Sequence, residues 1–266
     1  EKIFTQIGAV TGDERVPLQK KAVIVMCADN GVVEEGVTQT GQEVTAIVAE
    51  NFLTCNTSAA IMCKKAGVDI FPIDIGMAAD TKVPRYKTAN GTANMTKGPA
   101  MTRMQALQAI LTGIHQVKEK KEAGYKIIAT GEMGIGNTTT SSMLVAALTG
   151  RTAEEVTGRG AGLNDAGLLR KQQVIAQALE KYEKEIRSKH ALSMLAAFGG
   201  LDIAGMAGVC IGGALYHVPV VLDGLISSVA ALVAERIVPG VREFVLPSHL
   251  SKEPAAKWIA EELKLH

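Results

Sequence analysis

The residues best suited to chemistry stand in one glycine-rich stretch, Thr130-Gly-Glu-Met-Gly-Ile-Gly-Asn-Thr-Thr139. It follows a β-branched run and leads into a helical segment, so it predicts a strand-to-helix turn. Such a turn directs unpaired backbone N–H groups and a helix dipole at one point, which is what a phosphate requires. Glu132 is placed to contact a neighbouring hydroxyl group. The predicted phosphate ligands are Gly131, Met133, Gly134, Ile135, Gly136, Asn137 and Thr138.

Two familiar phosphate loops resemble this stretch and fit it poorly. The spacing Gly131-x-x-x-x-Gly136 is that of a P-loop, but Asn137 stands where that loop needs a lysine to reach the β and γ phosphates. A dinucleotide-binding turn places its glycines as G-x-G-x-x-G, whereas here they run G-x-x-G-x-G with an acid inside the turn. We therefore interpret the stretch as a turn that binds a monophosphate. The alternative is a glycine-rich turn that binds no ligand.

A second glycine loop, Gly158-Arg-Gly-Ala-Gly-Leu163, precedes a helical segment that carries Arg170 and Lys171. Lys171 could supply the positive charge that Asn137 lacks. The alternative is that both basic side chains face solvent, as long basic side chains usually do.

The elements that position these residues alternate between strands and helices. Short β-branched runs of the kind found in buried strands occur at residues 22–27, 69–74, 126–130 and 219–223. Helical stretches are expected at residues 42–66, 101–123, 138–148, 164–185, 201–215 and 225–237. The alternation predicts an α/β fold in which a parallel, Rossmann-like sheet is covered by helices on both faces.

Three of the expected strands end in polar or glycine-bearing turns: Asp29-Asn30-Gly31, Gly131–Gly134 and Asp223-Gly224. In an open α/β sheet, ligands bind outside the carboxyl ends of the strands. We therefore expect the site at these turns. Asp and Gly also end strands simply as turn residues, and this interpretation stays open for any single turn.

The composition excludes several classes of protein. The formal net charge of +1 gives no reason to expect a nucleic acid or an anionic membrane as a partner. No apolar run approaches the ~20 residues that cross a bilayer. The four cysteines form no CxxC pair and suit reduced thiols in a cytoplasmic protein. The five histidines show no metal-binding spacing, so we expect neither a metal nor another cofactor.

Beyond these local patterns, the chain resembles a known family through motifs spread over nearly its whole length. The matching stretches are Cys27–Gly36, Val44–Ile47, Gly98–Met101, Gly131–Thr139, Gly199–Met206, Leu222–Leu225 and Pro247-Ser-His-Leu-Ser251. On these residues the chain resembles the nicotinate-nucleotide:dimethylbenzimidazole phosphoribosyltransferases, which activate the lower-ligand base of cobamides.

The resemblance implies a six-stranded parallel sheet in a large domain, taken as residues 20–250. It also implies a small helical domain made from both chain ends, to which residues 1–19 and 251–266 would contribute. The family forms dimers, so we expect a homodimer or a heterodimer with a paralogous subunit.

The implied reaction displaces nicotinate from nicotinate mononucleotide by an aromatic base and gives an α-linked ribotide. The turn Gly131–Thr138 and Lys171 would hold the 5′-phosphate, and Glu132 would lie by the ribose as an auxiliary catalytic residue. The base and nicotinate would contact Asp29, Asn30, Thr40, Val48, Asp223, Ser248, His249 and Ser251.

The sequence departs from the family's pattern in two ways. The principal catalytic glutamate of the family, in a Gly-Glu-Gly motif, would come beyond His266, and a Pro-Pro-Gly segment would precede Glu1. Missing ends, a partner chain that completes the site and a degenerate paralogue are competing explanations. Asn30 and Val48 stand where the family usually has His and Gln, which would suit a phenol as acceptor.

Two rival functions also remain. The chain could be a non-catalytic nucleotide-binding subunit that supports a catalytic paralogue. By fold analogy alone, it could instead be an unrelated α/β oxidoreductase or small-molecule binding domain.

Overall fold

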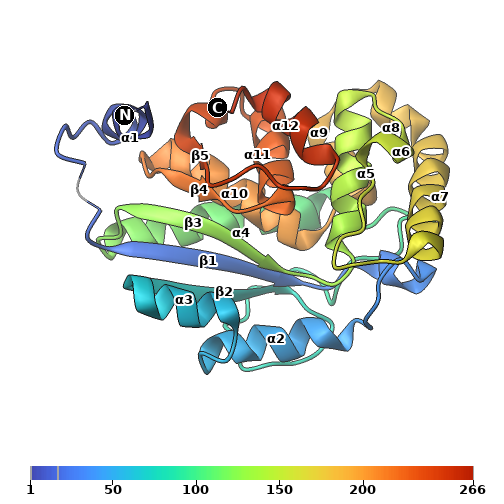
Figure 1. Ribbon diagram of the computed structural model, residues 1–266, viewed down its shortest axis with the longest axis horizontal. Coiled ribbons are helices and arrows are strands. Elements are labelled where there is room, and N and C mark those ends of the chain that lie inside the picture. The colour runs from blue at the N-terminus through green and yellow to red at the C-terminus, as the bar shows by residue number, and fades with distance from the viewer. Residues whose placement is uncertain (1, 17, 266) are drawn as a thin grey trace.

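A parallel sheet of five strands runs through the centre of the computed structural model, which describes residues 2–16 and 18–265 (Figure 1). The strand order is β2-β1-β3-β4-β5. The strands are β1 (Lys21–Ala28), β2 (Val68–Gly76), β3 (Ile127–Met133), β4 (Val220–Leu222) and β5 (Val245–Pro247). All neighbouring pairs are parallel, so the carboxyl ends of the strands lie along one edge of the sheet.

Alternate residues of β1 enter two separate hydrophobic clusters. Ile24 and Met26 belong to the main core, whereas Val25 and Cys27 belong to a smaller cluster on the opposite face. This division follows from the two-residue period of a strand, which sends successive side chains to opposite faces. A β-branched run without polar residues is therefore what a central strand covered on both sides requires.

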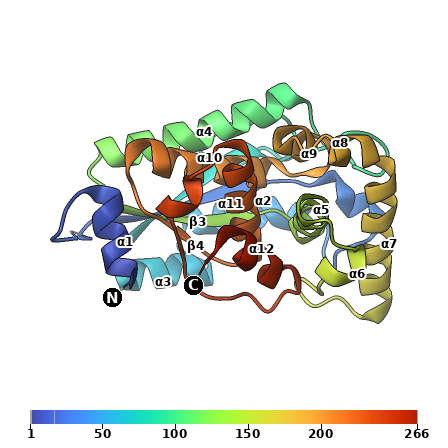
Figure 2. The ribbon, with the colours of Figure 1, turned by 90° about the horizontal axis from the view of Figure 1, so that it is seen from above.

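Helices cover the two faces unequally (Figures 1 and 2). The smaller cluster lies under α2 (Glu43–Leu53) and α3 (Ser58–Ala66). The main core lies under α4 (Arg103–Glu122), α10 (Leu201–Tyr216) and α11 (Leu225–Ile237). A Cβ atom at Gly208 would stand 2.0 Å from the carbonyl oxygen of Ile110, so α4 and α10 pack with their backbones in contact.

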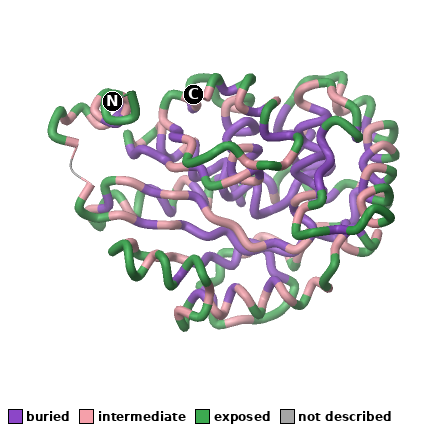
Figure 3. The backbone as a smooth tube through the Cα atoms, in the orientation of Figure 1, coloured by how far each residue is buried: buried purple, intermediate pink, exposed green. Residues whose placement is uncertain are grey.

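The remaining helices surround this core. They are α1 (Lys2–Thr11), η1 (Gly31–Glu35), α5 (Asn137–Thr149), α6 (Ala153–Val156), α7 (Asp165–Lys181), α8 (Glu183–Arg187), α9 (Ala191–Phe198), η2 (Val241–Phe244) and α12 (Ala255–Leu263). Buried residues concentrate in the sheet, α5, α9, α10 and α11, while the outer faces of α2, α3 and α7 are exposed (Figure 3).

The four strands expected from the sequence are confirmed, and the three-residue β5 was not predicted. The five strands within the described residues are one fewer than the resemblance implied. The helix expected over residues 42–66 is two helices, since Cys55 takes a left-handed φ of 58° between them. A run of residues in the right-handed α region cannot pass through such a position. Among the described residues, no helix is long and apolar enough to cross a membrane.

The two terminal helices attach to the sheet domain in different ways. The amide of Gln6 in α1 donates to the carbonyl oxygens of Glu243 and Val245, at 3.0 and 3.2 Å. Helix α12 places Ile259 and Leu263 in the main core. The expected division into residues 20–250 and the terminal segments 1–19 and 251–266 stays a prediction, and residues 1, 17 and 266 lie outside the described residues.

Candidate active site

Polar side chains from three neighbouring strands meet at the carboxyl edge of the sheet. Glu132 stands near the end of β3, opposite Met26 of β1, and Asn30 follows the end of β1. Asp223 follows β4, and its carboxylate is close enough to contribute to the raised pKa of Glu132. The expectation that these turns come together at one edge is therefore confirmed.

Asn137 joins two acidic side chains at this edge. It is the first residue of α5 and is 4% exposed. Its Nδ2 donates to Oε2 of Glu132 and, at 2.9 Å, to Oδ2 of Asp202, a fully buried residue in the first turn of α10. Both protons of the amide group are thus used to hold the two carboxylates in place.

The surroundings make both carboxyl groups weak acids. Burial is the main cause that raises the pKa of Glu132 to about 7, and repulsion from the Asp202 carboxylate adds to it. Burial also raises the pKa of Asp202 to about 6, against the opposing effect of the Asn137 hydrogen bond. An acid with a pKa near neutrality can exist in either form at working pH, which is the property expected of a catalytic carboxyl group.

Glycines allow the backbone to approach these carboxylates. A Cβ atom at Gly134 would stand 2.4 Å from Oδ2 of Asp202 and 2.7 Å from the carbonyl oxygen of Ala28. At Gly200 it would stand 2.3 Å from Oδ1 of Asp202 and 2.6 Å from Oδ1 of Asn30. Any side chain at either position would displace the acidic group.

A cavity of about 120 Å³ opens beside the amino-terminal end of α5. No side chain caps this helix end, whose N-cap residue Gly136 has a left-handed φ of 94°. The cavity is bounded by the loop after β1, the β3–α5 turn and the loop before α7. Its lining is Val37, Thr38, Gln39, Thr40, Gly134, Ile135, Gly136, Asn137, Thr138, Arg159, Ala161 and Leu163. An uncapped helix end in a small cavity is suited to bind an anion.

Lys171 brings a positive charge to this cavity from α7. Its side chain is wholly buried, and Nζ donates to Oγ1 of Thr138 at 2.9 Å and to the carbonyl oxygen of Gly158 at 3.3 Å. Burial lowers the pKa of Lys171 to about 8, against an opposing effect of the Glu253 carboxylate. The sequence alternative of a solvent-facing Lys171 is therefore excluded, whereas Arg170 is exposed as that alternative expected.

The β3–α5 turn is anchored from α2. The backbone N–H of Ile135 donates to Oγ1 of Thr45 at 3.1 Å, and Thr45 is fully buried. The side chain of Thr45 also hydrogen-bonds to Asp29, and burial is the main cause that raises the pKa of Asp29. Asp29 in turn accepts a 2.7 Å hydrogen bond from the N–H of Ala78. Residues after β1 and β2 and on α2 thus fix the position of the turn.

Comparison with known proteins identifies the family to which this chain belongs. A family model described as "Phosphoribosyltransferase" matches residues 1–266. The chain belongs to this phosphoribosyltransferase family. It is 45% identical over 270 residues to the nicotinate-nucleotide–dimethylbenzimidazole phosphoribosyltransferase of Clostridium acetobutylicum, an alignment that covers 100% of this chain and 76% of that protein. The protein of the same name from Acetivibrio thermocellus is 43% identical over 266 residues, with 99% and 75% of the two chains covered.

A solved structure agrees with this assignment. The crystal structure of CobT from Thermus thermophilus matches with a TM-score of 0.95 and 34% identity, over 100% of this chain and 80% of that one. The α/β class predicted from the sequence is thereby confirmed, and so is the resemblance to the phosphoribosyltransferase family.

Some of the predicted site residues of this phosphoribosyltransferase lie away from the small cavity. Gly131 stands within β3 with its α-carbon facing Val25 and Val23, and Met133 and Val48 pack against the smaller hydrophobic cluster. Asn30 is fully buried, and its side chain lies beside Asp202, whose pKa it lowers. Of the predicted base-contacting residues, Thr40 lines the cavity.

The predicted Ser-His-x-Ser residues form a neighbouring group. Ser248, His249 and Ser251 line a cavity of about 290 Å³ between the end of β5 and α12. The hydroxyl of Ser248 donates to the carbonyl oxygen of Asp223 at 3.0 Å. This contact connects the Ser-His-x-Ser segment to the β4 turn and so to the edge where Glu132 stands.

Three residues of the site were absent from the sequence prediction: Thr45, Asp202 and Glu253. Thr45 and Asp202 had been noted only as parts of family motifs. Glu253 accepts a 3.0 Å hydrogen bond from the N–H of Gly160 and stands beside the Gly158 loop. An acid in the first turn of a helix, like Asp202, is common, so its sequence position alone gives no signal of chemistry.

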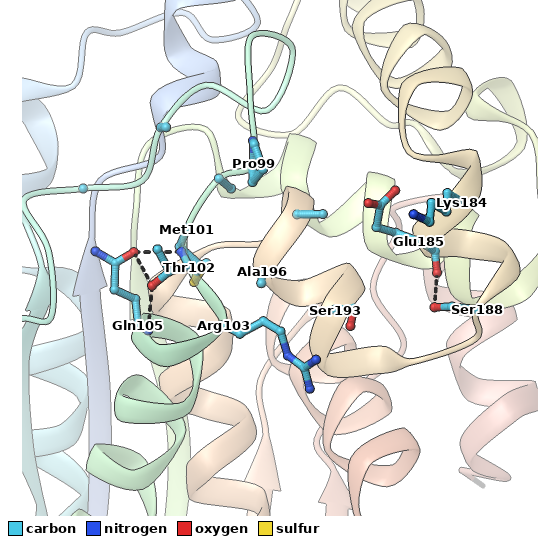
Figure 4. Close-up of a pocket in the computed structure, with 14 residues that line it drawn as sticks. Pro99, Met101, Thr102, Arg103, Gln105, Lys184, Glu185, Ser188, Ser193 and Ala196 are labelled. Carbon is cyan, nitrogen blue, oxygen red and sulfur yellow. Dashed lines mark hydrogen bonds between the residues drawn. The ribbon is translucent and has the colours of Figure 1, made fainter.

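A larger cavity of about 760 Å³ lies elsewhere, between the start of α4 and the α8–α9 region (Figure 4). Pro99, Met101, Ala196 and other small apolar groups line much of it, with Arg103 at its side (Figure 4). It contains none of the strand-end residues described above, and we assign the site to the small cavity beside α5.

Proposed function

We propose that this chain transfers the 5-phosphoribosyl group of nicotinate mononucleotide to dimethylbenzimidazole or a related aromatic acceptor, in the biosynthesis of cobamides. The names of its relatives support these substrates. The observation that carries the proposal is the cavity at the uncapped end of α5, where Thr138 accepts a hydrogen bond from the buried Lys171 and Asn137 donates one to Glu132. A ribose monophosphate needs an anion site of this kind next to a carboxylate.

The proposed roles follow from the geometry. The uncapped amino-terminal end of α5 and the ammonium group of Lys171 bind the 5′-phosphate. Glu132 then faces the ribose, where positive charge develops at C1′ as the bond to nicotinate breaks. Nicotinate leaves with the electron pair of that bond, a ring nitrogen of the acceptor forms the new bond to C1′, and the proton of the acceptor's N–H group is released. The principal glutamate of the family, expected beyond His266, stays a prediction.

The acceptor pocket is proposed from Asp29, Asn30, Thr40, Val48, Asp223, Ser248, His249 and Ser251. Val48 offers no polar group to an acceptor, so phenol belongs among the acceptors to be tested. We also propose a cytoplasmic protein that pairs with a second copy or a paralogous subunit. The free thiols of Cys27 and Cys210 fit a reducing compartment.

The test is to incubate the purified chain with nicotinate mononucleotide and either dimethylbenzimidazole or phenol, and to follow free nicotinate and the ribotide by chromatography. We expect nicotinate release that depends on the acceptor and is equal in amount to the ribotide formed. Lys171→Met should reduce it strongly, whereas Lys181→Met, at an exposed position of the same helix, should not.

Two other outcomes would decide against the proposal. Nucleotide binding without turnover, followed by turnover when a paralogous subunit is added, would favour a supporting subunit. Binding of NAD in preference to nicotinate mononucleotide would favour an unrelated nucleotide-binding function.

A further inference from the structure

The carboxyl groups of the half-buried Glu132 and the fully buried Asp202 form an acidic pair. Both accept a hydrogen bond from the same nitrogen, Nδ2 of Asn137. None of the salt bridges found among residues 2–16 and 18–265 includes either acid. Two adjacent negative charges in a buried setting repel each other and lose their hydration, so a pair of this kind keeps a proton.

The local backbone determines which acid holds the proton. Asp202 lies in the first turn of α10, where the helix dipole favours a negative charge, and its Oδ1 accepts a 2.9 Å hydrogen bond from the N–H of Ile203. Glu132 lies near the end of β3 and receives a hydrogen bond from Asn137, whereas Asn30 also lowers the pKa of Asp202. The ionised form is therefore better stabilised on Asp202.

We propose that Asp202 is a positioning residue of the active site, which is ionised near neutral pH and makes Glu132 keep its proton to a higher pH, while Asn137 holds the two carboxyl groups side by side. The inference deepens the proposed function, because it concerns the carboxylate placed beside the ribose. A protonated Glu132 donates a hydrogen bond to the substrate, and it stabilises positive charge at C1′ only after it loses its proton. Turnover therefore increases as the pH rises through the pKa of Glu132, which burial and the Asp202 charge raise to about 7.

Other groups around Glu132 have defined effects on this titration. Asp223 faces it from the turn after β4 and raises its pKa further. Asn137 faces it from α5 and lowers its pKa by the hydrogen bond. Cys27 of β1 lies near enough for its thiol to be influenced by Glu132, and burial raises the pKa of that thiol so that it stays neutral. Asp202 is thus the strongest charged influence on Glu132.

The direct test follows the side-chain carboxyl carbon of Glu132 by ¹³C NMR over a pH titration, with Glu132→Gln to assign the signal. In Asp202→Asn, which keeps the size of the side chain, the midpoint should fall by about one unit or more, a tenfold change in proton affinity. In Asn137→Ala the midpoint should rise, because the donor to the carboxylate is lost. An unchanged midpoint in a folded Asp202→Asn protein overturns the proposal, and if that variant does not fold, the direction of the shift in Asn137→Ala decides.

A kinetic test separates this proposal from the proposed function. In the transferase reaction, the rising limb of kcat against pH should move to lower pH in Asp202→Asn, with little change in KM for the nucleotide. If Asp202→Asn is active and its kcat rises over the same pH range as that of the wild type, the role of Asp202 is contradicted. If the wild-type chain shows no turnover, the proposed function fails, and the NMR titration still decides whether Asp202 sets the proton on Glu132.

Discussion

Lys171 and Thr138 are joined by a 2.9 Å hydrogen bond from Nζ to Oγ1, although they lie on different helices and 33 positions apart in the chain. Burying an ammonium group is costly unless it is paired or binds an anion. Here the group has two neutral oxygen acceptors and stands at the end of α5 beside an open cavity. The two residues thus mark a site suited to bind an anion.

Replacing Lys171 with Met should weaken the binding of nicotinate mononucleotide by about 10- to 100-fold, because one charge-assisted hydrogen bond to the phosphate is lost. Calorimetric titration measures this change, and Lys181→Met is the control. The wild-type affinity should also fall as the pH rises above about 8, where Lys171 loses its proton. An affinity unchanged in Lys171→Met would contradict the assignment of the phosphate.

Replacing Gly134 with Ala should lower the free energy of unfolding by more than about 2 kcal/mol. The new Cβ atom would overlap Oδ2 of Asp202 and the carbonyl oxygen of Ala28. Urea unfolding gives the change in free energy. Gly98→Ala is the matched control, because nothing lies within 4 Å of a Cβ atom there. Equal stabilities of the two variants would show that the Gly134 contact is relieved by small movements.

Replacing Glu132 with Gln should change how stability depends on pH. The pKa of Glu132 is about 7 in the folded chain and 4.5 for an unperturbed glutamate, so the folded state binds more protons between these values. The contribution of Glu132 to the free energy of unfolding should therefore fall as the pH rises from about 4.5 to 7. Glu132→Gln should lose part of this fall and be the more stable protein at pH 8, by on the order of 2 kcal/mol.

Urea unfolding at a series of pH values measures this effect. Glu180→Gln, at an exposed position of α7, is the control and should follow the wild type. A Glu132→Gln protein with the same pH dependence as the wild type would mean that this carboxyl group titrates normally.

Replacing Thr45 with Val should remove the acceptor for the N–H of Ile135 and leave that part-buried donor without it, at a cost of about 1 kcal/mol. Because the turn loses its anchor, the affinity for the nucleotide should also fall several-fold. Thr45→Ser keeps the hydroxyl and should restore both properties. Failure of Ser to do so would assign the effect to packing of the methyl group.

Local sequence patterns predict much of the architecture. Continuous β-branched runs predict β1 and β3 because a central parallel strand is buried on both faces. The strand β5 escaped prediction although it is as long as β4. The helix break at Cys55 escaped prediction because a left-handed residue other than glycine has no sequence signature.

Only the part of the site that has a local sequence pattern was predictable. The glycine spacing of residues 131–136 identifies the β3–α5 turn, and the structure adds the cavity beside it. The links from Asn137 to Asp202 and from Thr45 to Ile135 join residues 65 and 90 positions apart. Such pairs depend on how helices pack across the sheet, which no local pattern specifies.

The central claim is that the β3–α5 turn and Lys171 bind a nucleotide phosphate. The most direct measurement compares, by calorimetry, the affinities of nicotinate mononucleotide and of the riboside that lacks the phosphate, in the wild type and in Lys171→Met. The account predicts that the wild type prefers the phosphorylated ligand by at least about tenfold and that Lys171→Met loses most of this preference. Equal affinities of the wild type for both ligands would contradict it.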